Sequence, residues 1–179
     1  MSNTKLLEKK EIADGTMLFR FEKPEGFSYL AGQSVDIILP NPPETDAEGN
    51  KHAYTLSSAP HESDLYIVTR MRDTAFKRSL NNMEIGGELD IDGPFGDLTL
   101  HENIKRPAVF LAGGIGITPF HSIILEATKN KLSYKITLFY SNRRPEDTAF
   151  LSELDNLQNE NQNYKLVATM TDIANSTLD

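Results

Sequence analysis

Residues 111–119 read Leu-Ala-Gly-Gly-Ile-Gly-Ile-Thr-Pro, and this stretch decides the fold of the second half of the chain. It overlaps a continuous apolar run, Ala108 to Ala112, which is typical of a parallel strand covered on both faces. Its three glycines permit a tight turn and a close approach of the backbone to a ligand. Thr118 and Pro119 then predict a helix N-cap followed by proline at the first helical position.

A helix that begins directly after a glycine turn can bind an anion. Its free backbone N–H groups point toward the ligand, and the helix dipole favours a pyrophosphate there. The residues expected to contribute are Gly113, Gly114, Gly116, Thr118 and Pro119. Alternatively, the glycines serve only the tight packing of strand against helix. The position of the motif between a strand and a helix favours nucleotide binding.

Downstream of this turn, helical and strand patterns alternate. Phe120, Ile123, Ile124 and Ala127 have helical spacing, and residues 136–140 predict a second strand. Pro145 is expected to open a helix, and residues 164–169 predict a third strand. The order βαβαβ is half of a nucleotide-binding parallel sheet.

Upstream, the first hundred residues have the two-residue period of β-strands. Apolar residues recur two positions apart, with one residue between them, in several places: Phe19 and Phe21, Val35 and Ile37, Leu65 and Ile67, and Leu89 and Ile91. This pattern predicts an antiparallel barrel or sandwich. A short helix is expected from Ala75 to Asn82, with Thr74 as its N-cap. We place the domain boundary near residue 104, giving domains 1–103 and 104–179.

The composition narrows the possible partners. The 179 residues are 39% hydrophobic and 25% charged, which is typical of a soluble globular protein. The net charge of −8 disfavours nucleic acid and anionic membranes as partners, because both select basic surfaces. There are no cysteines, which excludes disulfides, catalytic thiols and a cysteine-ligated iron–sulfur cluster in this chain.

Two further absences bear on location and metal binding. The polar first ten residues and the lack of a long apolar run predict neither a secretory signal nor membrane insertion, so the expected location is cytoplasmic. The histidines at positions 52, 61, 101 and 121 show no metal-ligand spacing, and no metal site is expected.

Three motifs in order carry a family resemblance. Residues 52–60, His-Ala-Tyr-Thr-Leu-Ser-Ser-Ala-Pro, resemble the flavin signature of the ferredoxin–NADP reductase superfamily, Arg-x-Tyr-Ser/Thr followed by small residues. Residues 93–96, Gly-Pro-Phe-Gly, resemble its barrel-closing motif, and residues 113–119 resemble its nicotinamide motif. The resemblance implies an antiparallel Greek-key flavin-binding barrel followed by a partial parallel-sheet NAD(P)-binding domain.

The same resemblance implies a set of FAD-binding residues in the barrel. Tyr54 would pack against the isoalloxazine or ribityl chain, and Thr55 would hydrogen-bond near flavin N5; these two form the expected catalytic pair. The other FAD-binding residues are His52, Ala53, Val68, Thr69, Arg70 and Thr74. Thr74 matches the position that supports the flavin phosphates, in a basic neighbourhood of Arg72, Lys77 and Arg78. The alternatives are an ordinary barrel tyrosine, a strand threonine and a simple helix cap on a solvated basic face.

His52 departs from the family pattern, which has arginine at this position. Arginine gives a phosphate a permanent forked charge, whereas histidine is mostly neutral at pH 7. We therefore expect weaker flavin retention than in relatives, improving at acidic pH, unless Arg70 or Lys77 takes over the phosphate contact.

The loop after the second parallel strand indicates which dinucleotide is used. Ser141, Arg143 and Arg144 stand where the adenosine ribose is read, and arginines there suit the 2′-phosphate of NADPH better than the 2′-hydroxyl of NADH. Alternatively, these arginines simply lie in an exposed loop.

The resemblance also implies the overall reaction and its limits. Relatives continue past the third parallel strand, so residues 109–112 are expected to form an open apolar sheet edge, in a chain that is truncated or completed by a partner. The implied activity is hydride transfer from NAD(P)H to FAD, with electrons passed to a separate acceptor: a redox protein, an iron–sulfur domain on another chain, or a small acceptor. The alternative is a flavin-binding electron-transfer subunit, or a non-catalytic interaction module, that needs a partner to complete the nicotinamide site.

Overall fold

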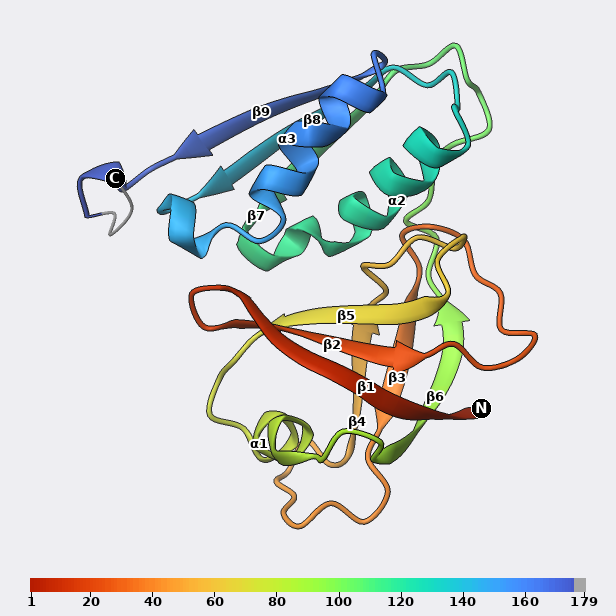
Figure 1. Ribbon diagram of the computed structural model, residues 1–179, viewed down its shortest axis with the longest axis vertical. Helices are drawn as coiled ribbons and strands as arrows, with labels where there is room; N and C mark the ends of the chain where they lie inside the picture. Colours follow the sequence, from red (N-terminus) through yellow and green to blue (C-terminus); the bar gives the residue numbers. More distant parts are fainter. Residues whose placement is uncertain (176–179) are drawn as a thin grey trace.

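The computed structural model describes residues 1–175, which form an antiparallel sheet domain below a smaller α/β domain in Figure 1. The lower domain contains β1 (Ser2–Ala13), β2 (Thr16–Glu22), β3 (Ser34–Ile38), β4 (Lys51–Thr55), β5 (Asp64–Arg70), α1 (Ala75–Asn82) and β6 (Glu88–Phe95). Its strand order is β4-β3-β6-β1-β2-β5, with antiparallel pairing throughout. The sheet curls like a barrel. An isolated bridge between Leu56 and Ile67 links its two edges, so the barrel is closed only in part.

Alternating side chains make the core of this barrel. The predicted inward residues Phe19, Val35, Ile67 and Leu89 are buried with their partners on neighbouring strands. Helix α1 closes one end of the barrel and has the predicted bounds, with Thr74 as N-cap.

The upper domain has three parallel strands in the order β7-β8-β9. Its elements are β7 (Ala108–Gly113), the 3₁₀ turn η1 (Gly114–Ile117), α2 (Thr118–Lys129), β8 (Ile136–Asn142), η2 (Pro145–Asp147), α3 (Leu151–Glu160), β9 (Tyr164–Met170) and η3 (Ile173–Asn175). This domain and the barrel together confirm the predicted fold class. The proposed boundary at residue 104 falls between β6 and β7, and residues 176–179 of the predicted second domain lie outside the described residues.

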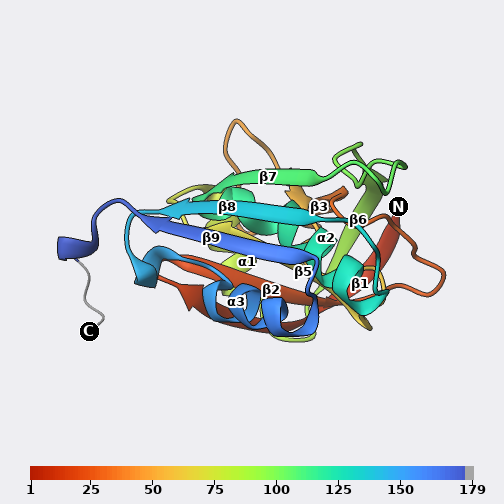
Figure 2. The same cartoon turned by 90° about the horizontal axis from the view of Figure 1, so that it is seen from above.

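The expectation that β7 is covered on both faces is wrong. Figure 2 shows the three strands side by side with α2 behind them. Ala108, Phe110 and Ala112 face the helices, whereas Val109 and Leu111 on the opposite face are 60% and 75% exposed. The reason is that no element within residues 1–175 packs on that face, so the strand is half-buried although all its residues are apolar or glycine.

Both predicted helix starts in this domain need correction. Thr118 is the first residue of α2 rather than its N-cap, because η1 takes up the preceding turn and leads directly into the helix. The helix expected from Pro145 begins only at Leu151. Pro145 opens the short turn η2 instead, after which Thr148 is extended and Phe150 adopts a left-handed conformation with φ of 61°.

Candidate functional site

The barrel half of the candidate site is built on β4 and α1. His52 and Tyr54 alternate with Ala53 and Thr55 along β4 and lie against Phe76 of α1. The ring centroid of Phe76 is 4.2 Å from that of His52 and 6.0 Å from that of Tyr54. Burial raises the pKa of Tyr54 to about 12, with a hydrogen bond involving Thr69 acting in the opposite direction. Tyr54 is therefore a neutral phenol at physiological pH.

His52 has an unused hydrogen-bonding atom. Its Nε2 is buried and has no hydrogen-bond partner among the described residues. Buried polar nitrogens without partners are uncommon in folded proteins, and each calls for a physical explanation.

The N-terminus of α1 already holds a negative charge. The Thr74 hydroxyl accepts a hydrogen bond from the Lys77 N–H at 3.4 Å, as expected of a cap. The Ala75 N–H donates to the Asp46 carboxylate at 3.1 Å. This hydrogen bond, followed by one from the Glu48 N–H, lowers the pKa of Asp46. A side chain from the β3–β4 loop thus lies where the resemblance implies a flavin phosphate.

Two of the cations around α1 are engaged within the protein. Arg78 pairs with Glu44 at 2.6 Å and also with Asp73. Lys77 donates to the Arg70 carbonyl oxygen at 2.6 Å. Arg70, Arg72 and Arg78 are exposed to solvent, and Lys77 is half-buried.

The glycine turn leaves space for a ligand. Gly114 needs its glycine because its φ is +51°. A Cβ atom at Gly114 or Gly116 would meet nothing within 4 Å, so the backbone is open at both positions. Thr118 and Pro119 are buried, and the Thr118 hydroxyl donates to the Ile115 carbonyl oxygen at 3.3 Å.

A cavity of about 280 Å³ at the junction of the two domains brings predicted residues together. Arg70 reaches it from β5, while Gly114, Ser141 and Arg143 line it from the α/β domain. Its other lining residues are Asn142, Asp147 and Thr171. The Arg143 side chain is 70% exposed and lies 3.7 Å from Asp172. The cavity therefore combines an open glycine turn with two cationic side chains.

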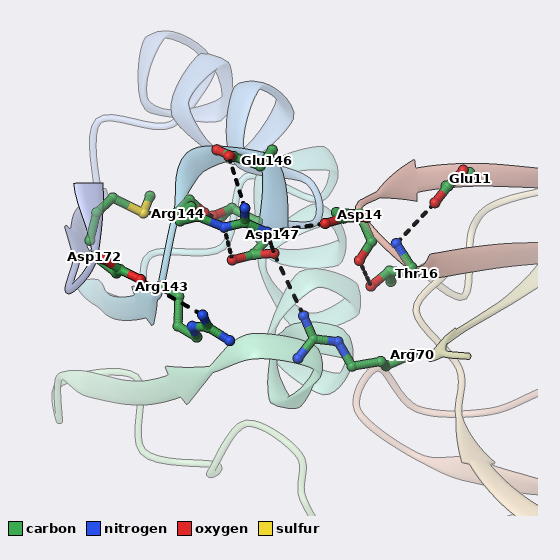
Figure 3. Close-up of polar contacts among 12 residues, drawn as sticks. Glu11, Asp14, Thr16, Arg70, Arg143, Arg144, Glu146, Asp147 and Asp172 are labelled. Atoms are coloured by element: carbon green, nitrogen blue, oxygen red, sulfur yellow. Dashed lines mark hydrogen bonds and ion pairs between the residues drawn. The ribbon is translucent and has the colours of Figure 1, made fainter. Parts of the chain in front are cut away.

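Arg144, in contrast, belongs to a network of ion pairs that joins the domains (Figure 3). Its guanidinium lies 2.8 Å from Asp147 and 3.0 Å from Asp14, which comes from the β1–β2 turn. Asp147 also lies 3.8 Å from Arg70 of β5. The Asp14 N–H donates to the Glu146 carbonyl oxygen at 2.8 Å. These contacts engage Arg144 in holding η2 against the barrel.

The candidate site thus has two parts. Arg70, Gly114, Ser141 and Arg143 share one cavity, while Gly113 and Ser141 also line a hollow on the uncovered sheet face. His52, Tyr54 and Thr74 cluster around the first turn of α1, and Val68 and Thr69 are buried on β5. Sequence reasoning missed Phe76 and Asp46, of which only Phe76 had a local signal, as an aromatic residue in the first turn of the predicted helix. No set of His, Asp or Glu side chains within residues 1–175 is arranged to hold a metal ion.

Comparisons with known proteins agree on one kind of oxidoreductase. The family model of the oxidoreductase NAD-binding domain matches residues 110–177. The chain is 32% identical over 157 residues to the phthalate 4,5-dioxygenase oxygenase reductase subunit of Pseudomonas putida, covering 84% of this chain and 46% of that protein. It is 28% identical over 171 residues to the terephthalate 1,2-dioxygenase reductase component 1 of a Comamonas species, covering 93% and 49%.

A solved structure shares the whole fold. The ferredoxin–NADP⁺ reductase of Plasmodium falciparum superposes with a TM-score of 0.81 at 18% identity, covering 94% of this chain and 70% of that one. The chain spans about half the length of the two curated relatives named above.

Proposed function

Because this chain belongs to the ferredoxin–NADP reductase superfamily, we propose that it binds FAD on its barrel and acts as an NAD(P)H-dependent flavin oxidoreductase. A flavin held on the barrel would supply the redox chemistry, as an acceptor of hydride from a reduced nicotinamide and a donor of electrons to a further acceptor. No nucleophile from the protein is needed for this reaction, so the chain's own residues bind, orient and exclude water.

The observation that carries this proposal is the cavity at the domain junction. It opens beside the glycine turn, where free space at Gly114 and Gly116 allows the phosphates of a dinucleotide to approach the backbone. Arg70 and Arg143 supply positive charge on opposite sides of this space, in a protein whose net charge is −8. Asp147 also lines the cavity, so two arginines face one carboxylate there, and the remaining positive charge favours an anionic ligand.

The barrel residues fit a flavin in three respects. The unpartnered Nε2 of His52 is a hydrogen-bonding atom that a flavin phosphate would satisfy. Tyr54, neutral and packed toward Phe76, offers a flat apolar surface to an aromatic ring system. Thr55 follows Tyr54 at the end of β4 that points toward the α/β domain, where a hydrogen bond to N5 would place the reactive edge next to the nicotinamide.

The preference for NADPH rests on Arg143. Arg144 is engaged with Asp147 and Asp14, which leaves Arg143 as the arginine available to a 2′-phosphate. Asp172 lies beside Arg143, and its carboxylate would suit the 2′-hydroxyl of NADH. The preference is tested by measuring the rate of flavin reduction with NADPH and with NADH, in wild type and in Arg143→Ala. The substitution should slow flavin reduction by NADPH and leave flavin reduction by NADH nearly unchanged.

The electron acceptor is proposed to be a separate redox protein. Two similar proteins are reductase components of dioxygenase systems, and this chain has no cysteine with which to hold an iron–sulfur cluster of its own. A cytoplasmic location stays a prediction. Within residues 1–175, none of the helices has the length and apolarity needed to cross a bilayer.

The decisive experiment is anaerobic reduction of the purified chain. After loading with FAD, the visible flavin spectrum is recorded before and after one equivalent of NADPH or NADH is added. Bleaching with either nucleotide supports the oxidoreductase. A flavin spectrum that persists, with no ferricyanide reduction, favours instead an electron-transfer subunit that needs a partner chain. Failure to bind FAD would refute the flavin site on β4 and α1.

A further inference from the structure

One buried histidine joins the two domains at a point that the binding motifs do not explain. His121 lies on α2 and is 4% exposed. Its Nδ1 is 2.8 Å from the carbonyl oxygen of Ser57, in the barrel segment that follows β4. Its Nε2 is 3.1 Å from Oε2 of Glu153 on α3. The ring stacks on Phe150, with centroids 3.8 Å apart and planes 16° from parallel.

Both hydrogen-bond partners of this ring are acceptors. A carbonyl oxygen and a carboxylate each need an N–H, and a neutral imidazole has only one N–H to give. The hydrogen bond from His121 lowers the pKa of Glu153, so a charged carboxylate faces the ring at neutral pH. The geometry of the pocket therefore matches the doubly protonated, positively charged form of His121.

The contacts of His121 connect the two proposed binding motifs. Ser57 is the second residue after Thr55, at the end of the flavin strand, and His121 is the third residue after Thr118, in the helix that follows the glycine turn. A parallel contact supports the same junction, because the Ser122 hydroxyl donates to the Ser58 carbonyl oxygen at 2.5 Å. A change at this junction shifts the end of β4 relative to the start of α2.

We propose that His121, in its doubly protonated form, is a positioning residue that fixes the separation of flavin and nicotinamide, so that hydride transfer slows when the ring loses a proton. This inference rests on the proposed function. It adds a residue that touches neither the dinucleotide cavity nor Tyr54 and Thr55.

Among residues 1–175, Glu153 is the charged side chain that contacts the His121 ring, and its own side chain is 49% exposed. Phe150 covers one face of the ring. Lys10 and Glu11 of β1 line the same groove of about 400 Å³ as Glu153 and Phe150, but both are exposed at its rim. Both side chains are solvated and they carry opposite charges, so their combined electrostatic effect on the buried His121 ring is small.

A second histidine at the same interface provides a matched control. Nδ1 of His61, in the loop after β4, lies 2.6 Å from Oε2 of Glu126 on α2. This pair also bridges the barrel and the α/β domain, but the His61 ring is 30% exposed, and within residues 1–175 it has no second hydrogen-bond acceptor and no stacked ring. Its single acceptor needs a single N–H, which a neutral imidazole supplies.

The substitution Glu153→Gln separates the charge requirement from the packing. An amide at residue 153 can donate an N–H to Nε2, so a neutral His121 can keep both hydrogen bonds. Flavin-loaded wild type, Glu153→Gln and Glu126→Gln are mixed anaerobically with NADPH, and the rate of flavin bleaching is followed from pH 6 to pH 9. We expect the wild-type and Glu126→Gln rates to fall about fivefold or more with rising pH, and the Glu153→Gln rate to stay flat.

A readout without flavin tests the ring itself. The ¹⁵N shifts of the His121 ring in the cofactor-free protein, assigned by their loss in His121→Gln, should show two N–H groups at pH 7 in wild type and one in Glu153→Gln. If His121→Gln does not fold, Glu153→Gln carries the assignment by the shift it causes.

The outcomes distinguish two failures. Flavin that binds but is not bleached in wild type would refute the proposed function and this inference with it. Bleaching with the same pH profile in wild type and Glu153→Gln, or a singly protonated ring at pH 7 in wild type, would refute the inference and leave the proposed function standing.

Discussion

Replacing Gly32 with alanine tests how closely the barrel approaches the α/β domain. Gly32 has a φ of +97°, and a Cβ atom there would lie 2.0 Å from the Leu98 carbonyl oxygen and 2.9 Å from Cδ1 of Ile123 on α2. Side-chain atoms are essentially never found below 3.0 Å in such contacts, so the backbone at Leu98 must move. Gly26→Ala is the matched control, because its φ is +73° and a Cβ atom there meets nothing within 4 Å.

The expected magnitudes follow from two separate costs. Placing an L-residue at positive φ costs about 1–2 kcal/mol at either position. Overpacking against a backbone oxygen adds about 1–3 kcal/mol at Gly32 alone. Reduced freedom of the unfolded chain returns about 0.4–1 kcal/mol to both variants. Gly26→Ala should therefore lose about 1 kcal/mol and Gly32→Ala about 2–4 kcal/mol.

Urea unfolding followed by far-ultraviolet circular dichroism measures both variants, since the chain contains no tryptophan for fluorescence. Equal decreases in the free energy of unfolding in the two variants would show that the Leu98 backbone moves aside at no cost and that the close approach at Gly32 has no energetic consequence. A loss below 1 kcal/mol for Gly32→Ala would refute the reasoning outright.

Three further substitutions probe the site. Arg144→Gln removes the guanidinium that lowers the pKa of Asp147. A carboxyl group with a lowered folded-state pKa stabilises the fold at pH values above its ordinary pKa near 3.8, and this stabilisation is lost as the pH falls through the folded-state pKa. The variant should therefore melt at a lower temperature than wild type at pH 7, and the difference should shrink toward pH 3 in thermal melts. Phe76→Leu removes the ring beside His52 and should cost about 1 kcal/mol in urea unfolding and weaken FAD binding severalfold, whereas unchanged FAD affinity would separate this ring from the flavin site. Asp46→Asn removes the charge at the start of α1 and should tighten FAD binding about three- to tenfold in low-salt titrations, with a smaller gain at high salt; no gain would mean that the phosphates bind elsewhere.

Local patterns predicted much of the fold. Helix α1 has the predicted bounds because its N-cap, Thr74, and its amphipathic residues lie in one short continuous stretch of the chain. In β1, the same approach found little, since Thr4 and Leu6 are the fully buried residues of this strand and its remaining ten show no clear alternation. β1 pairs with β2 across the turn at Asp14-Gly15, but its other partner, β6, lies outside any local window.

In the candidate site too, motifs that are contiguous in sequence could be predicted, whereas contacts between distant residues could not. The glycine turn was readable because strand, turn and helix are contiguous in sequence. Asp46 escaped notice because it caps a helix that begins 29 residues later, and such a contact leaves no local spacing. Arg144 was expected to read a phosphate, yet Asp14 from the opposite end of the chain engages it. Long-range ion pairs of this kind are set by how the domains pack.

The pairing of β1 with β6 bears on how the chain is made in the cell. Ser2 pairs with Ile91, so the barrel sheet stays incomplete until the 89 residues that follow Ser2 have been synthesised. At about 5–20 residues per second, the first strand waits roughly 5 to 20 seconds for its neighbour. During that interval, Phe19 and Phe21 on β2 lack the core that later buries them. The nascent barrel thus exposes these two aromatic side chains until β6 is made, well before the second domain exists.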